Sequence, residues 1–244
     1  MRLNHNKILI TGATSGIGRA LAEHFCQLDN QIIAVGRNEA KLEELAKLDN
    51  RIATYKCDLS SQLELDRLVT FIKQKHTDLN ILINNAGIQY NCNLLNDTYS
   101  LQKVDNEISI NLTVPIKLIA SLLPVLQINS NAAIVNVSSG LAIVPKAKSA
   151  VYCGTKAAIH IFSKSLRYQL ENVKVFEIIP PLVDTKMTKG RGKGKITPKR
   201  LVDEFIKAFK SNRYEVNIHK VKLLRIVNRI SPTIADRIMK RATT

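Results

Sequence analysis

The sequence predicts an α/β fold: a doubly wound parallel sheet with helices on both faces, formed by residues 1–244 as a single domain. Three observations support this prediction. Short β-branched runs alternate with longer helical patterns, which is typical of a parallel sheet whose strands are connected by helices. A glycine-rich turn follows the first of these runs. The chain of 244 residues with 45% hydrophobic content is also large enough for one sizeable core, and we find no domain boundary or internal repeat.

The predicted strands are short apolar runs, and the predicted helices are longer segments with apolar residues three or four positions apart. Strands are expected at Lys7–Thr11, Gln31–Val35, Arg51–Lys56, Asn80–Ile83, Ala133–Val137 and Val173–Ile179. Helices are expected between them at Ile17–Leu28, Glu39–Leu48, Leu63–Lys75, Leu101–Leu126 and Val151–Leu170. The alternation of strand and helix predicts that the strands run parallel.

The last part of the chain continues this pattern and then becomes basic. A helix is expected at Lys199–Lys210, a last strand at Tyr214–His219 and a basic amphipathic helix at Leu223–Met239, within a C-terminal segment 221–241. Ser231 followed by Pro232 indicates a helix restart in that segment, because Ser caps helices and Pro suits the first helical position. We therefore expect a helical end to the chain.

A turn between the first strand and the first helix has the composition of a phosphate-binding loop. Gly12 allows a tight turn, Gly16 lets a pyrophosphate approach the backbone, and Gly18 lets the helix pack against the sheet. The N-terminus of the helix then offers unpaired N–H groups to the phosphates. A sharp structural turn with no ligand is the alternative. The candidate binding residues in this turn are Gly12, Thr14, Ser15, Gly16, Ile17 and Gly18.

The end of the second strand bears on the choice between NAD and NADP. An acidic residue there would bond the ribose 2′-hydroxyl of NAD, whereas an Arg accommodates the 2′-phosphate of NADP. The acidic position is occupied by Gly36, and Arg37 follows it. A guanidinium suits a phosphate, so NADP is favoured over NAD. Glu39, two residues further on, and the reading of Arg37 as a solvated loop residue keep NAD open.

Tyr152, Lys156 and Ser139 form a candidate centre for hydride-transfer chemistry. The phenol can donate a proton to a developing alkoxide, although its ordinary pKa near 10 is too high for easy cycling at neutral pH. Lys156 lies one helical turn away, and its ammonium is expected to lower that pKa. Ser139, after the Ala133–Val137 strand, is expected to hydrogen-bond the carbonyl oxygen. A second Tyr-x-x-x-Lys, at Tyr99 and Lys103, has no serine thirteen residues before it.

These motifs together resemble the classical short-chain dehydrogenase/reductase family across roughly residues 5–185. The matching residues are Thr11–Gly18, Asp58, Asn84-Asn85-Ala86-Gly87, Asn111, Ser139, Tyr152 and Lys156. The resemblance implies a seven-stranded Rossmann sheet, a nicotinamide cofactor, a small-molecule carbonyl or alcohol substrate, and a homodimer or homotetramer. It further implies that Asp58 and Leu59 contact the adenine side, that Asn85, Ala86 and Gly87 line the adenosine, and that Lys156 holds the nicotinamide ribose.

The resemblance assigns roles to two more regions. Asn111 would hold a helix kink and a water that relays protons to Lys156, although a purely structural kink is the alternative. Pro180, Val183 and Thr185 lie in the segment beneath the nicotinamide, where Pro181 replaces the family's usual glycine and removes an N–H. In this double proline the sequence resembles the bacterial branch labelled DltE-type oxidoreductases. Residues 186–212 correspond to the family's substrate lid.

The substrate is less well specified by the sequence. Apolar residues that are expected to flank the site are Tyr90, Leu141, Ile143, Leu182 and Met187. The lid carries five cations that could attract an acidic or phosphorylated substrate, and a solvated loop is the alternative. These cations are Lys186, Lys189, Arg191, Lys193 and Lys195.

Charge and composition limit the other function classes. Residues 186–244 carry 17 Lys and Arg against 4 Asp and Glu, whereas residues 1–185 carry 19 against 16. The basic tail could cover a core, form a subunit interface or contact an anionic membrane, and a cofactor-binding sensor or nucleic-acid-associated protein acting through it is the alternative function. Nucleic-acid binding is not expected, because the chain has no Trp and its aromatics are not interleaved with the cations.

Metal binding and export are not expected either. The five histidines are isolated, and no Gly-x-Ser-x-Gly elbow marks a hydrolase. His160, one turn after Lys156, is interpreted as a helix-interface residue in preference to a proton shuttle. Apolar runs are too short for a membrane span, and no signal peptide is present. The scattered cysteines, Cys26, Cys57, Cys92 and Cys153, are interpreted as reduced thiols of a cytoplasmic protein.

Overall fold

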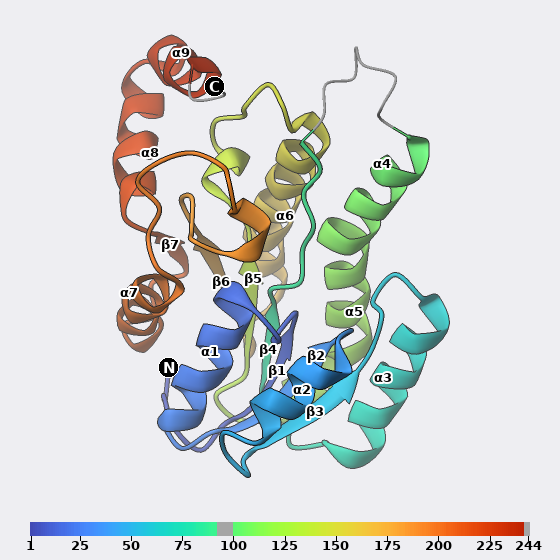
Figure 1. Cartoon of the computed structure of the whole chain (residues 1–244). Helices are drawn as coiled ribbons and strands as arrows, with labels where there is room; N and C mark the ends of the chain where they lie inside the picture. The colour runs from blue at the N-terminus through green and yellow to red at the C-terminus, as the bar shows by residue number, and fades with distance from the viewer. Residues whose placement is uncertain (92–99, 242–244) are drawn as a thin grey trace.

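The computed structural model describes residues 1–91 and 100–241 and forms one parallel sheet between two layers of helices (Figure 1). The seven strands lie in the order β3-β2-β1-β4-β5-β6-β7. They are β1 (Lys7–Thr11), β2 (Gln31–Gly36), β3 (Ile52–Lys56), β4 (Ile81–Asn84), β5 (Ala133–Val137), β6 (Lys174–Ile179) and β7 (Glu215–Asn217). The chain reverses its winding between β1 and β4, and ligands of such sheets bind at this point, beyond the carboxyl ends of the strands. The predicted doubly wound fold is confirmed.

Two hydrophobic clusters hold the helices onto the sheet. One face is covered by α1 (Gly16–Gln27), α2 (Glu39–Ala46) and α7 (Pro198–Lys210). The other face is covered by α3 (Gln62–Lys75), α5 (Val114–Gln127) and α6 (Ala150–Gln169). Both faces of β1, β2, β4, β5 and β6 are therefore buried, which explains their continuous apolar runs, whereas the edge strand β3 is largely exposed.

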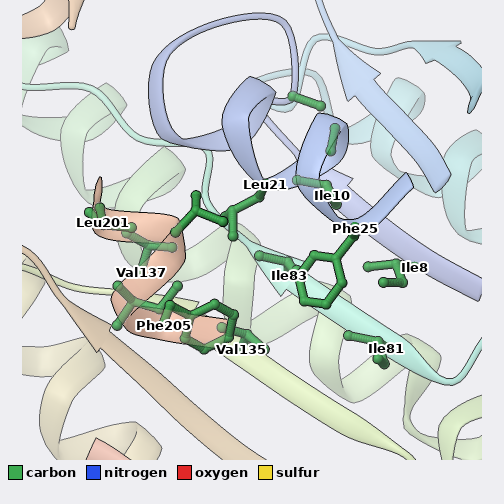
Figure 2. Close-up of a cluster of buried hydrophobic side chains, with 14 of the residues drawn as sticks. Ile8, Ile10, Leu21, Phe25, Ile81, Ile83, Val135, Val137, Leu201 and Phe205 are labelled. Atoms are coloured by element: carbon green, nitrogen blue, oxygen red, sulfur yellow. The ribbon is translucent and has the colours of Figure 1, made fainter. Parts of the chain in front are cut away.

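Aromatic rings dominate the core beneath α1 and α7. Phe25 of α1 packs edge-on against Phe205 and Phe209 of α7, with ring centroids 6.4 and 6.0 Å apart. Figure 2 shows the Phe25 ring beside Ile8 and Ile83 of β1 and β4, and Phe205 beside Val135 of β5. Such edge-to-face pairs add to the stabilisation that burial of the rings already gives.

A row of buried polar side chains ties α6 to the centre of the sheet. Asn84 Nδ2 donates to Asn136 Oδ1 at 2.9 Å, and Asn136 Nδ2 donates to Ser163 Oγ at 2.9 Å. Ser163 Oγ in turn donates to the carbonyl of Ile159 at 2.7 Å. Because these groups lie away from water, each lost hydrogen bond would cost about 1–3 kcal/mol. The row therefore opposes any shift of α6 along β4 and β5.

The predicted Leu101–Leu126 helix is divided into three parts. It forms α4 (Leu101–Ile108), a π-helical turn (Ser109–Thr113) and α5. The π turn contains Asn111, at the position where a kink was expected. By length and composition, Leu101–Gln127 could cross a membrane, so the expectation that no apolar stretch is long enough was wrong. The buried side of α5 packs on the sheet, as expected of a core helix.

The expected lid region and C-terminal helix each contain two parts. Within residues 186–212, the segment 186–197 forms a turn and a loop, whereas α7 has Leu201, Phe205 and Phe209 fully buried and belongs to the core. The segment 221–241 forms α8 (Lys220–Ile230) and α9 (Pro232–Arg241), which pack on each other. Ser231, in an extended conformation with φ −147°, separates them. The predicted helix restart is thus confirmed, and α8 and α9 lie above α7 in Figure 1.

Candidate active site

A large cleft of about 1340 Å³ runs across the carboxyl ends of the strands, from Arg37 at one end to α8 and α9 at the other. It brings together the glycine-rich turn, the Asn85–Gly87 segment, Ser139, Tyr152, Lys156 and the 180–185 segment. Of the predicted site residues, Gly18 and Asn111 do not line it, because both lie beneath residues that do. Tyr99, of the second Tyr-x-x-x-Lys pair, lies outside the described residues, as does Cys92.

The glycine-rich turn is held so close to neighbouring backbone that side chains do not fit. Gly12 has φ +66°, and a Cβ there would lie 2.9 Å from Ala86 Cα. A Cβ on Gly18 would lie only 2.3 Å from the carbonyl oxygen of Gly12. Ser15 precedes α1 without a capping hydrogen bond from its side chain, so the N–H groups of the first turn of α1 face the cleft uncapped. These features make a cradle for an anionic group.

The end of the cleft beside Arg37 leaves little room for a side chain at position 36. A Cβ on Gly36 would lie 2.5 Å from Thr14 Cγ2, so a larger residue fits only if the Thr14 side chain moves. Arg37 follows with a side chain that is 69% exposed, and its Nη1 lies 3.9 Å from Asp58 Oδ2. Glu39 does not compete for this place, since it pairs with Lys56 at 2.7 Å. An exposed guanidinium is therefore available beside the cleft.

The segment after β4 is fixed by the end of β1. Asn85 Nδ2 donates to the carbonyl of Thr11 at 2.9 Å, and the backbone N–H of Ala86 donates to Thr11 Oγ1 at 3.1 Å. Gly87 follows, and a Cβ there would lie 3.2 Å from Asn111 Oδ1 and 3.7 Å from Lys156 Nζ. Gly87 therefore lies close to both the Asn111 amide and the Lys156 ammonium.

The segment after β6 forms the opposite wall of the cleft. Pro180 is fixed at its carbonyl, which accepts a hydrogen bond from the backbone N–H of Gly140 at 2.9 Å. Val183 is buried, and the Thr185 side chain lies 3.0 Å from the position of a Cβ on Gly16. The 180–185 segment therefore faces the glycine-rich turn across the cleft.

Tyr152 and Ser139 both line the cleft, and the Ser139 side chain is near enough to the phenol to act on the pKa of Tyr152. Ser139 follows β5, and its Oγ accepts from the N–H of Leu141 at 3.1 Å, which fixes the hydroxyl at the start of a short 3₁₀ turn. Burial raises the pKa of Tyr152 to about 12, against the effect of the Ser139 side chain, which lowers it. The phenol is therefore protonated throughout the neutral range, as a proton donor must be.

Lys156 lies beneath Tyr152 on the next turn of α6. Its Nζ is 5.7 Å from the centre of the Tyr152 ring and donates to the carbonyl of Val137 at 2.8 Å. Burial lowers the pKa of Lys156 to about 8, while the carboxylates of Glu177 and Glu107 oppose this fall. The expected lowering of the Tyr152 pKa is thus not produced by this geometry: the burial of both groups outweighs their attraction.

Asn111 holds the loop that crosses the cleft. Its Oδ1 accepts from the N–H of Ile88 at 2.9 Å, and its Nδ2 donates to the carbonyl of Ile88 at 2.8 Å. Nδ2 also lies 3.3 Å from Thr155 Oγ1. These hydrogen bonds occupy the Asn111 side chain with structural contacts. They support the structural interpretation of Asn111 over its role in a proton relay.

Several residues at this site were not found from the sequence. Glu107 of α4 is fully buried, and its Oε1 accepts from the N–H of Tyr90 at 3.0 Å. Glu177 of β6 is also fully buried, and its Oε2 lies 2.8 Å from Nδ1 of His160. For Glu177 the only signal in the sequence was a charged residue within an otherwise apolar strand. For Glu107 no signal existed, because nothing in the sequence shows that its helix position is buried.

The substrate end of the cleft was predicted only in part. Tyr90, Leu141, Leu182 and Met187 line it as expected, whereas Ile143 does not. Lys146 and Lys148 also line it, as do apolar residues of the C-terminal helices, which were expected to cover the core or a partner. These helix residues are Leu223, Leu224, Val227, Ile238 and Met239. Within the described part of the chain, no cluster of three or more metal-ligating side chains occurs.

Comparisons with known proteins agree with this architecture. The family model for short chain dehydrogenases matches residues 6–195. The chain is 36% identical, over its whole length and 99% of the relative, to the uncharacterized oxidoreductase DltE of Bacillus subtilis. Among solved structures it is similar to a short chain dehydrogenase from Burkholderia cenocepacia in complex with NADP, with 22% identity, coverage of 98% and 99% of the two chains and a TM-score of 0.87.

A second solved structure has a different nicotinamide cofactor. It is a short chain dehydrogenase/reductase from Burkholderia phymatum in complex with NAD, which has 18% identity, coverage of 94% and 96% of the two chains and a TM-score of 0.83. The fold is therefore shared by proteins with either nicotinamide cofactor. By its family match and its full-length relative, this chain belongs to the short-chain dehydrogenase family and is an oxidoreductase.

Proposed function

We propose that this protein transfers a hydride between NADP(H) and a carbonyl or secondary-alcohol substrate, with Ser139, Tyr152 and Lys156 as its centre. The observation that carries the proposal is that these three side chains line one cleft, with Lys156 Nζ 5.7 Å from the centre of the Tyr152 ring. A bound nicotinamide supplies the hydride to the carbonyl carbon, or accepts it from the alcohol.

The side chains of the protein bind the substrate oxygen and transfer a proton to it. In the reductive direction, Ser139 donates a hydrogen bond to the carbonyl oxygen, and Tyr152 donates its proton as the alkoxide forms. The Lys156 ammonium stabilises the phenolate that remains, and solvent returns the proton. Because the pKa of Lys156 is about 8, the cation is present below that pH and reduction is expected to slow above it.

The cofactor side of the cleft supports a dinucleotide. The glycine-rich turn leaves no room for side chains at Gly12 and Gly18, and the uncapped N-terminus of α1 offers N–H groups to a pyrophosphate. NADP is preferred to NAD in this proposal because Gly36 offers no carboxylate and Thr14 crowds a side chain there, while Arg37 is exposed beside it. Binding of NADP is also known for the similar protein from Burkholderia cenocepacia.

The catalytic part of the proposal is tested by following loss of NADPH absorbance over a panel of aldehydes, ketones, diketones and quinones. Turnover is expected in the wild type and is expected to be lost in Tyr152→Phe, with NADPH affinity retained. Turnover that survives in Tyr152→Phe would contradict the assignment of the proton donor. Binding of NADPH without turnover of any carbonyl would favour the alternative function, a cofactor-binding sensor.

The cofactor preference is tested separately with Arg37→Gln and with Arg67→Gln, an exposed arginine of α3 outside the cleft, as the matched control. Loss of a charge-assisted hydrogen bond is expected to weaken NADPH binding about ten- to hundred-fold, with little change for NADH. Equal affinity of the wild type for NADPH and NADH would overturn the argument from Gly36 and Arg37.

A further inference from the structure

The end of the cleft near Arg191 gathers positive charge that the described residues, 1–91 and 100–241, do not neutralise. Arg191 Nη1 donates to Gln89 Oε1 at 2.8 Å, and Lys146 Nζ donates to Asn91 Oδ1 at 3.3 Å. Both acceptors are neutral amides. Within residues 1–91 and 100–241, neither Arg191 nor Lys146 is within ion-pair distance of a carboxylate, although Lys195, elsewhere in the same loop, pairs with Asp184. Arg191 and Lys146 are thus held by neutral groups and, among the described residues, form no ion pair.

The backbone around Arg191 directs its side chain into the cleft. Gly190 and Gly192 have φ +74° and +53°, a conformation that favours glycine, and the N–H of Arg191 donates to the carbonyl of Thr188 at 3.0 Å. A Cβ on Gly192 would lie 2.7 Å from Leu182 Cδ2, so the loop is packed closely against the wall of the cleft. Arg191 is therefore built into this site, unlike a solvated loop cation.

The acceptor of Arg191 is itself held in place. Gln89 Nε2 donates to Ser149 Oγ at 3.1 Å, and Ser149 Oγ donates to Asn91 Oδ1 at 2.9 Å. One chain of neutral groups thus positions both cations, because Asn91 also accepts from Lys146. Such an arrangement orients the guanidinium and the ammonium while leaving their charges for a ligand.

Arg191, Lys146 and Lys148 line the same cleft as Tyr152, and their charges act on the pKa values of Lys146 and Tyr152. The pKa of Lys146 is lowered by burial and by the like charges of Arg191 and Lys148. Arg191 also lowers the pKa of Tyr152, whereas Glu107 raises it. Glu107 is fully buried and does not line the cleft, and its Oε1 already accepts a backbone hydrogen bond from Tyr90. An anion from outside would relieve the repulsion among the cations.

The remaining wall is apolar and is provided mainly by the C-terminal helices. Leu224 and Val227 of α8, with Ile238 and Met239 of α9, face the cleft together with Leu141 and Leu182. A ligand that reaches from Arg191 across this wall must bury apolar surface, which is the usual source of affinity in such pockets. The site therefore combines an anion-binding end with an apolar side.

We propose that the substrate is an amphiphilic anion, a ketone or secondary alcohol whose carboxylate or phosphate is held by Arg191 and Lys146 and whose apolar part lies against α8 and α9. This inference rests on the proposed function and specifies its substrate class. In the reductive direction, hydride adds to the carbonyl carbon and a proton to its oxygen. The anionic group is unchanged in the reaction and serves only for recognition.

The first experiment compares matched substrates: a medium-chain oxo fatty acid, its methyl ester, and the corresponding oxoalkyl phosphate. The acid or the phosphate is expected to exceed the ester in kcat/KM by about ten- to hundred-fold, the effect of a hydrogen bond to a charged group. The better of the two identifies the anionic group. Equal kcat/KM values for the ester and both anions would overturn the inference while leaving hydride transfer by Tyr152 intact.

Variants locate the anion-binding group. In Arg191→Gln the ratio of anion to ester is expected to fall close to one, and Arg191→Lys is expected to restore part of it. Arg213→Gln, an exposed arginine after α7 that does not line the cleft, is the matched control and should keep the wild-type ratio. A preference that persists unchanged in both Arg191→Gln and Lys146→Gln would refute the assignment.

A binding measurement separates this inference from the proposed function. Calorimetry with NADPH-loaded protein compares octanoate and octyl phosphate with neutral octanamide. At least one anion is expected to bind about ten-fold more tightly than the amide, and this advantage should disappear in Arg191→Gln. Anions that bind no better than the amide would overturn the inference, even if neutral ketones are reduced. Tight anion binding without any turnover would instead count against the proposed reaction.

Discussion

Replacement of Lys156 by methionine should abolish turnover and yet relieve an electrostatic cost in the folded protein. Burial lowers the pKa of Lys156 from its ordinary value of 10.5 to about 8. The unfolded chain therefore binds this proton more strongly than the folded one does, so the stability of the wild type rises with pH between these two values. From pH 7 to pH 10 the rise is about 2 to 3 kcal/mol, since one pKa unit corresponds to about 1.4 kcal/mol.

Methionine has no titrating group, so Lys156→Met lacks this pH-dependent contribution. It also loses the hydrogen bond from Nζ to the carbonyl of Val137, but that loss is nearly the same at both pH values. The informative quantity is therefore the difference in free energy of unfolding between variant and wild type, compared at the two pH values. Relative to the wild type, the variant should be about 2 to 3 kcal/mol more favoured at pH 7 than at pH 10.

The assay is urea unfolding of both proteins, freed of nucleotide, at pH 7 and pH 10. Circular dichroism and intrinsic tyrosine fluorescence should give coincident transitions, which justifies a two-state analysis. All other ionisable groups are shared by the two proteins and cancel. If the wild type and Lys156→Met differ by the same free energy of unfolding at both pH values, then the ammonium is not desolvated as described, and the argument from burial fails.

Three other substitutions test separate parts of the structure. Gly18→Ala should destabilise the protein by about 1–3 kcal/mol, as overpacking does, because its Cβ meets the carbonyl of Gly12; thermal unfolding measures this, and an unchanged Tm would contradict the close approach. Glu177→Gln removes a carboxylate that raises the pKa of Lys156, so the alkaline loss of reductase activity should move to lower pH; a shift to higher pH would exclude this coupling. Phe205→Ala should cost about 3–5 kcal/mol of stability in urea unfolding, the range for truncation of a buried ring; a cost below about 1 kcal/mol would be inconsistent with a residue that has no exposed surface.

The order of the elements could be predicted because it depends on local patterns. The alternation of buried runs and helices gave six strands within a residue or two, since both faces of a parallel sheet are covered. The glycines of the first turn were equally readable, because Gly12 and Gly18 are required by backbone approaches that no other residue permits. Predictions of this kind rest on the properties of single residues.

The electrostatics of the site could not be predicted in the same way. The pKa of Tyr152 was expected to fall beside Lys156, but it rises because both groups are buried and Lys156 turns to Val137. Burial depends on what other elements place over a residue, and this is not encoded in spacing. For the same reason, the sequence predicted a helical tail but not that α8 and α9 would form a wall of the cleft.

The buried row of Asn84, Asn136 and Ser163 fixes the register of α6 relative to the sheet. A slide of α6 by one residue would break the amide pairing with Ser163 and carry Tyr152 away from Ser139. The position of the Tyr152 side chain therefore stays the same, whatever ligand occupies the cleft. Changes in the 186–197 loop or in α8 and α9 can then alter which molecule is accepted while leaving the point of proton transfer unmoved. Attempts to redirect the specificity of this protein should accordingly begin with those outer segments.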